Sequence, residues 1–143
     1  MKDTMIRCAL LSVFSFFCLL GSVQAQDLHQ TVRIADSLYN EGKLEEALQL
    51  YRRIAFFDKS EVYDETTFPR LASGFFQTGD YSNASRYFEY SYNISDDINY
   101  LYDQVLMQIL AGDYKLAKLN LLNVSTGNND EVKARKLALL SMV

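Results

Sequence analysis

Hydrophobic positions recur along this chain in three segments that share one spacing. Each segment has a glycine, an apolar or aromatic residue two positions later, an alanine five positions later and a large apolar residue nine positions later. The glycines are Gly42, Gly79 and Gly112, the alanines are Ala47, Ala84 and Ala117, and the large residues are Tyr51, Phe88 and Leu121. Because glycine adopts a left-handed conformation at little cost, each glycine is expected to end a helix. Because alanine is small, each alanine is expected to let two helices approach closely.

A small or apolar residue lies twelve positions before each alanine, at Ala35, Ala72 and Val105. These residues would lie opposite the alanines, so each unit is predicted to be a helix, a tight turn and a second, antiparallel helix. The predicted helices cover residues 28–40, 44–57, 67–77, 81–93, 98–110, 114–124 and 130–142. Pro69 is expected near the start of its helix, and Asp130 is expected to cap the last one.

The spacing resembles that of the tetratricopeptide repeat, a helix-turn-helix unit of 34 residues. The resemblance covers nearly all of residues 26–143, with repeats at about 28–61, 65–97 and 98–130 and a terminal helix at 131–143. It implies an all-α fold: a right-handed superhelical stack of antiparallel helix pairs, or α-solenoid. Two features depart from the family pattern. Three extra residues separate the first two units, and Gln104 and Gln108 occupy positions where apolar residues are expected.

The terminal helix looks like the first half of a fourth unit, since no glycine turn follows it. Counting from the preceding unit predicts that Leu137 and Ala138 pack on the stack. Leu139, Leu140 and Met142 would then stay uncovered, and an uncovered apolar patch usually marks an interface. This segment is therefore expected to form a homodimer contact, to cap the stack, or to continue into a longer protein.

The N-terminus has the order of a secretory signal peptide. Lys2 and Arg7 precede a nearly unbroken apolar run over residues 8–20, and small residues lie at Val23 and Ala25. Cleavage after Ala25 would remove residues 1–25, and with them both cysteines of the chain. The alternative is a membrane anchor, but the run is shorter than the roughly 20 apolar residues that a span needs. No stable membrane span is expected after cleavage.

Composition argues against several functions. Residues 26–143 carry twelve Lys and Arg against seventeen Asp and Glu, without a basic cluster, so nucleic-acid binding is not expected. His29 is the only histidine, so neither a histidine-based triad nor a zinc cluster can be assembled. Asp96 and Asp97 with Asp103 could suggest an acidic metal site, but two aspartates before a helix more often cap it. The prediction is a non-enzymatic protein without catalytic residues, metal or cofactor.

In the tetratricopeptide family the first helix of each unit lines a concave face that binds extended peptides or helices. The resemblance places these residues on that face: Val32, Asp36, Tyr39, Asn40, Ser73, Phe76, Gln77, Tyr102, Leu106 and Leu110. The competing interpretation is that their aromatic side chains pack in the core. The leading hypothesis is a protein- or peptide-binding scaffold of the bacterial envelope, exported to the periplasm or secreted. The alternatives are a self-associating structural module and the N-terminal interaction domain of a longer envelope protein.

Overall fold

The computed structural model describes residues 28–58, 61–125 and 129–143, and the predicted signal peptide lies outside them. These described residues form seven helices and no strand, which confirms the all-α prediction. The first helix covers residues 28–40. The others are α2 (Leu44–Phe57), α3 (Asp64–Gln77), α4 (Tyr81–Ser95), α5 (Ile98–Leu110), α6 (Tyr114–Asn123) and α7 (Asp130–Leu140).

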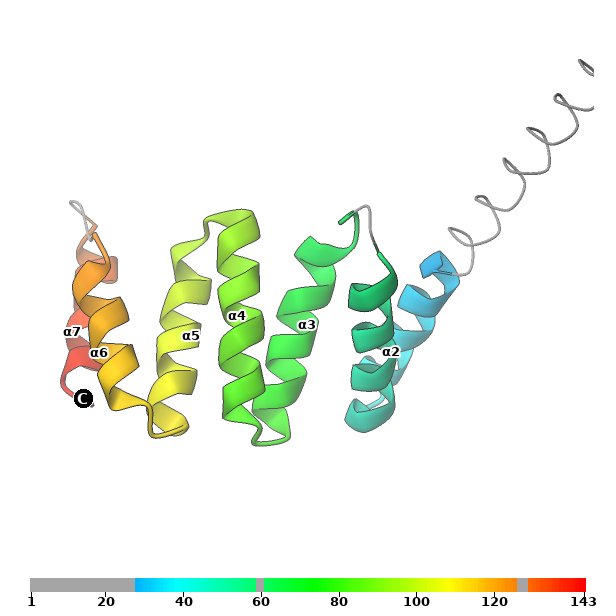
Figure 1. Ribbon diagram of the computed structural model, residues 1–143, viewed down its shortest axis with the longest axis horizontal. Coiled ribbons are helices and arrows are strands. Elements are labelled where there is room, and N and C mark those ends of the chain that lie inside the picture. The colour runs from blue at the N-terminus through cyan, green and yellow to red at the C-terminus, as the bar shows by residue number, and fades with distance from the viewer. Residues whose placement is uncertain (1–27, 59–60, 126–128) are drawn as a thin grey trace, which may run out of the picture.

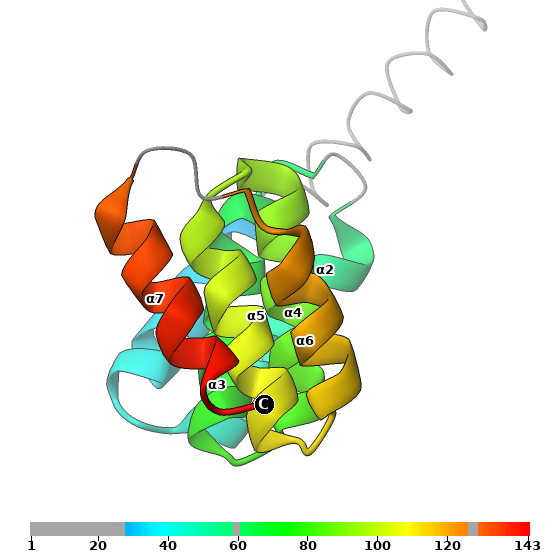
Figure 2. The same cartoon turned by 90° about the vertical axis from the view of Figure 1, so that its left-hand side faces the viewer.

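The helices stand side by side in a row that follows their order in the chain (Figure 1). Seen from the end of the row, they form two layers (Figure 2). The helices α2, α4 and α6 lie in one layer, which is called the second-helix layer below. The other layer holds the first helix of each pair, including α3, α5 and α7, and is called the first-helix layer. The arrangement is a stack of antiparallel helix pairs.

The three glycine turns have the same geometry, which accounts for the repeat spacing. Gly42, Gly79 and Gly112 have positive φ angles of 77°, 78° and 85°. After each glycine, the next backbone N–H donates to the carbonyl five residues earlier, at N···O distances of 2.8–2.9 Å (Lys43 to Leu38, Asp80 to Phe75, Asp113 to Gln108). This is the Schellman arrangement, which satisfies carbonyls left open at a helix end.

The small residues of the repeat are buried in the core. Six positions are fully buried: Ala35, Ala47, Ala72, Ala84, Val105 and Ala117. The buried residues form two clusters. One extends from the first helix to Met107 in α5, and the other joins α5, α6 and α7 through Tyr102, Leu121 and Leu139. The core is therefore divided at α5, where the half-buried Leu106 packs against both clusters.

The α2–α3 contact depends on a glycine inside a helix. Gly74 is buried in α3, and a Cβ atom at this position would lie 2.6 Å from Cδ2 of Leu48 in α2. A glycine in a helix interior costs about 1 kcal/mol relative to alanine. Here the absent side chain lets the two helices approach each other.

Four helix boundaries differ from those predicted: α3 begins three residues earlier, α4 ends two residues later, and α6 and α7 end one and two residues earlier. The third helix begins at Asp64 rather than residue 67, because the Tyr63 carbonyl accepts from the N–H groups of Thr66 and Thr67. Pro69 consequently lies inside α3 rather than near its start. The last helix is capped by Asn129, whose Oδ1 accepts from the N–H groups of Glu131 and Val132, and not by Asp130.

The face that α7 turns toward the stack is also different from the predicted one. Leu139 is 7% exposed and belongs to the second core cluster, and Leu140 packs against that cluster. Leu137 is 66% exposed. The buried face follows the helical period from Val132 through Leu139 to Val143, not the count from the preceding unit. The prediction that Leu139 and Leu140 stay uncovered is therefore wrong, whereas Met142 is exposed as predicted. A dimer contact at this end of the chain remains a prediction.

Candidate functional site

Four polar and aromatic side chains meet between the helix over residues 28–40 and α3, in the first-helix layer. Asp36 and Tyr39 come from the first of these helices, and Arg70 and Gln77 come from α3. Nε2 of Gln77 donates to the Tyr39 hydroxyl at 2.8 Å, and the Arg70 guanidinium lies 4.9 Å from the Tyr39 ring centroid. Nε of Arg70 lies 3.9 Å from Oδ1 of Asp36. These four residues are called the Tyr39–Arg70 cluster below.

A buried tyrosine of α2 holds the cluster in place. Tyr51 is fully buried, and its hydroxyl donates to Oδ1 of Asp36 at 2.5 Å. Its ring meets Tyr39 edge to face, with 6.2 Å between centroids. Burial, followed by the Asp36 carboxylate, raises the pKa of Tyr51 well above its usual range. The Tyr51 hydroxyl is therefore protonated at neutral pH, and it positions the Asp36 carboxylate from the core side.

The outward side of the cluster is exposed. The Arg70 side chain is exposed, and its one ion pair is long and exposed too, so it contributes little to stability. A guanidinium carries five N–H donors in a planar fork, which suits carbonyl and carboxylate oxygens. Phe76, on the same helix, is also exposed and adds an apolar surface.

The structure gives the predicted groove residues of the first two units different environments. Asp36, Tyr39 and Gln77 come together in the Tyr39–Arg70 cluster. Val32 packs against the core, Ser73 is half-buried, and Asn40 and Phe76 are exposed. Their role in binding remains a prediction.

In the third unit, one predicted groove residue belongs to the core. Tyr102 is 1% exposed, because α7 lies against α5, and its hydroxyl donates to the Val132 carbonyl at 2.9 Å. Its assignment to a binding groove is wrong. Leu106 is half-buried and packs against both core clusters, whereas Leu110 is exposed. Gln104 and Gln108, which stand where the family pattern has apolar residues, are both buried in the structure. Oε1 of Gln108 accepts from Nδ2 of Asn120 at 3.1 Å.

A second polar cluster ties α7 to α5. Nη1 of Arg135 donates to Oδ1 of Asn99 at 2.9 Å, and Nη2 donates to Oδ1 of Asp103 at 2.6 Å. The guanidinium also lies over the Tyr102 ring, 5.2 Å from its centroid. Asp103 therefore binds an arginine, while Asp97 caps α5 by accepting from the Asn99 N–H at 2.9 Å.

We expect Arg135→Met to weaken α7 docking in a pH-dependent way. Burial raises the pKa of Asp103 above its ordinary 3.8, and Arg135 opposes that rise. A carboxylate with a raised pKa destabilises the fold once it is charged, so losing Arg135 should cost most above the folded pKa. The free energy of unfolding should fall by about 1–2 kcal/mol at neutral pH, discounted for partial exposure. The loss should shrink as the pH falls toward 3.8 and Asp103 becomes protonated.

Urea unfolding of both proteins at neutral pH and at about pH 4 measures this difference. Lys133→Met is the matched control, because Lys133 lies on the same helix and pairs with the exposed Asp130. An Arg135→Met loss that stayed constant with pH would contradict the assigned role of Asp103.

Two features of these clusters escaped the sequence reasoning. Arg70 and Asp103 each lie two residues before a repeat position, Ala72 and Val105, so a shared column of charged residues was visible. The role of Arg135 was not visible, because it depends on which face α7 turns inward.

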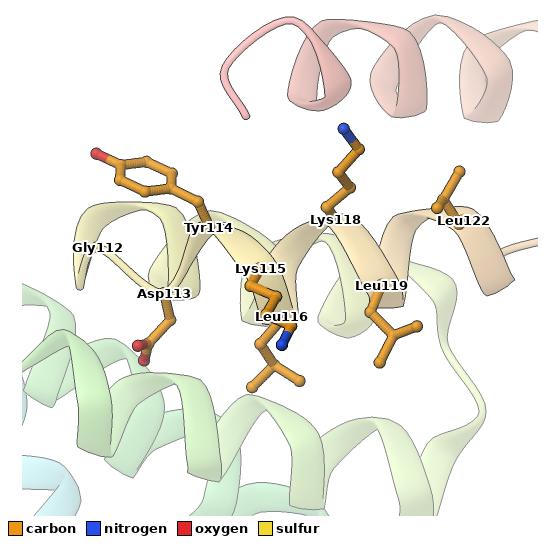
Figure 3. A pocket seen from close by; sticks show the side chains of 8 residues that line it. All are labelled: Gly112, Asp113, Tyr114, Lys115, Leu116, Lys118, Leu119 and Leu122. Atoms are coloured by element: carbon orange, nitrogen blue, oxygen red, sulfur yellow. The ribbon is translucent and has the colours of Figure 1, made fainter.

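A hollow of about 690 Å³ lies on the outer surface of α6 and was not predicted. It is lined by Gly112, Asp113, Tyr114, Lys115, Leu116, Lys118, Leu119 and Leu122 (Figure 3). The three leucines of this lining are exposed, while other residues of the same helix pack on α5.

Two kinds of feature, metal-binding groups and membrane-spanning helices, are absent from the described residues. Within residues 28–58, 61–125 and 129–143, His, Cys, Asp and Glu side chains form no group of three that could hold a metal ion. Among the described helices, none has the length and apolar composition that a membrane-spanning helix requires. The chain matches no protein-family model and has no significant match among curated proteins.

Proposed function

We propose that this protein is an exported, tetratricopeptide-type scaffold that binds a segment of another protein along its first-helix layer. In this proposal the helix pairs continue as a right-handed superhelix, the first-helix layer is its concave side, and residues 1–25 are a cleaved signal peptide of a bacterial envelope protein. The repeat spacing, the three identical glycine turns and the stacked helix pairs support the assignment.

The Tyr39–Arg70 cluster is the observation that carries the proposal. It brings together side chains from two first helices, Tyr39 and Gln77 being 38 residues apart in the chain. Tyr51 orders the cluster from the core side, so a ligand would meet side chains that are already positioned, which reduces the entropic cost of binding. The exposed Arg70 and Phe76 would supply a charged donor and an apolar contact, the combination found at many binding hot spots.

We expect Arg70→Ala combined with Phe76→Ala to reduce partner capture at least about tenfold, with the helical content unchanged. Both side chains are exposed, so their removal should leave the core intact. The purified protein would be used to capture partners from its own cellular compartment, with identification by mass spectrometry and helicity measured by circular dichroism.

Arg86→Ala is the matched control, because Arg86 is an exposed arginine on α4, in the second-helix layer. Tyr39 is not suited to this test, since its ring packs on Tyr51 and its loss would disturb the core. Unchanged capture by the double variant, or an equal loss with Arg86→Ala, would remove the support for this surface.

A further inference from the structure

The outer surface of α6 has an apolar face that the fold does not use. Leu116, Leu119 and Leu122 are 47%, 55% and 61% exposed and recur every three residues. On its inner side α6 buries Ala117 and Leu121 against the rest of the stack. A helix that is apolar on both sides is normally covered on both sides. Leu116 and Leu119, which point to the same side of α6, are called the α6 face below (Figure 3).

The α6 face is hollow and bordered by positive charge. It forms part of the 690 Å³ hollow described above, whose charged residues are Lys115, Lys118 and, at the start of the helix, Asp113. Figure 3 shows Leu116 and Leu119 pointing to one side of α6, and Lys118 and Leu122 pointing to the other. An occupant of this surface would therefore be apolar at its centre and acidic beside it.

The C-terminal end of α2 has these two properties. Phe56 and Phe57 are 77% and 59% exposed, and their rings meet edge to face with centroids 5.0 Å apart. The exposed acidic residues Glu61 and Glu65 follow closely in the chain. The basic Arg53, one turn before Phe57, has an interaction of its own within the chain. The pair Phe56 and Phe57 is called the phenylalanine tip below.

Charge separates the two surfaces along the chain. Residues 44–65, which include the phenylalanine tip, contain three Lys and Arg against six Asp and Glu, whereas residues 98–143, which include the α6 face, contain five against four. The two surfaces lie toward opposite ends of the row of helices, so they cannot meet within one molecule (Figure 1).

We propose that the phenylalanine tip of one copy docks on the α6 face of a second copy, head to tail. The two rings would fill the hollow over Leu116 and Leu119, and Glu61 and Glu65 would approach Lys115 and Lys118. Pairing of one α6 face with another is disfavoured, because it would bring the same lysines together. A contact between different surfaces leaves one tip and one face open at the ends, so it extends to longer chains as concentration rises.

The contact is small, so the association should be weak, with a dissociation constant of roughly 10–100 µM. Sedimentation velocity should be run on protein purified after any N-terminal processing by the producing cell. The average mass should rise as the protein concentration increases through this range. A protein that stayed monomeric throughout would overturn the proposal.

Two one-sided variants identify the contact. The tip variant, Phe56→Ser with Phe57→Ser, and the face variant, Leu116→Ser with Leu119→Ser, change exposed side chains only. Each should be monomeric alone, because each lacks one of the two surfaces. Mixed in equal amounts they should form a one-to-one dimer that grows no further, since the tip variant keeps its face and the face variant keeps its tip.

The other outcomes overturn the proposal. A tip variant that still associates would indicate pairing between two α6 faces, and a mixture that stays monomeric would indicate another occupant of the α6 face. Circular dichroism shows whether each variant is folded. If a serine variant were not, Lys115→Glu with Lys118→Glu tests the same contact by charge: it should abolish association, and adding Glu61→Lys with Glu65→Lys in the same chain should restore it.

Discussion

Ala84→Asp should lower the free energy of unfolding by about 3–5 kcal/mol, a large share of the stability of a domain of this size. Ala84 is fully buried in the first core cluster, which also contains Ala72 of the preceding helix. Aspartate would add volume to a close contact between helices and would leave a carboxylate buried with no basic partner. Thermal and urea unfolding, followed by circular dichroism, measure the loss.

Ser82→Asp is the control for this substitution. Ser82 lies two residues earlier in the same helix, is exposed, and occupies the first turn, where a negative charge is favourable. Asn83 would be a poor control, because its side chain donates to Oδ2 of Asp80 at 2.6 Å, and a new carboxylate would repel that capping residue. Equal losses for Ala84→Asp and Ser82→Asp would mean that the alanine column is not the contact between helices.

Leu139→Lys should also cost about 3–5 kcal/mol, whereas Leu137→Lys should change stability by less than about 0.5 kcal/mol. Leu139 is 7% exposed among the residues that join α5, α6 and α7, and Leu137, two residues earlier, is 66% exposed. A lysine at residue 139 would remove this contact and bury a charge. The repeat count alone predicts the opposite order of the two substitutions, so the comparison tests the orientation of α7.

Because the core is divided at α5, the damage from Leu139→Lys should be local at first. Hydrogen exchange should become faster in α6 and α7 before it changes in α2 and α3. Equal protection of α6 and α7 in the two lysine variants would show that α7 does not pack as described.

The repeat spacing determined the local structure because each signal acts over a few residues. At each turn the glycine N–H donates to the carbonyl three residues before it, and the N–H of the next residue donates to the carbonyl five residues before that one. Gly42, Gly79 and Gly112, which have positive φ angles, therefore mark the turns by themselves. A buried small residue one unit from the next marks where helices meet, and all six such positions are fully buried. The predicted helix ends on both sides of the three glycine turns were accurate. Those away from these turns were less so, as at residue 64, where the helix start depends on the Tyr63 carbonyl.

The tertiary structure decided which faces are covered, because that depends on neighbours distant in the chain. Tyr102 occupies a groove position in the repeat pattern. In the structure α7 covers it, and its hydroxyl donates to the carbonyl of Val132, 30 residues later. Arg70 became part of a candidate site only when α3 placed it over Tyr39, and the α6 leucines became a surface only because α6 turns Ala117 and Leu121 inward. Helical periodicity defines the possible faces of a helix, and packing between helices selects among them, since burial is a property of the whole stack rather than of any one segment.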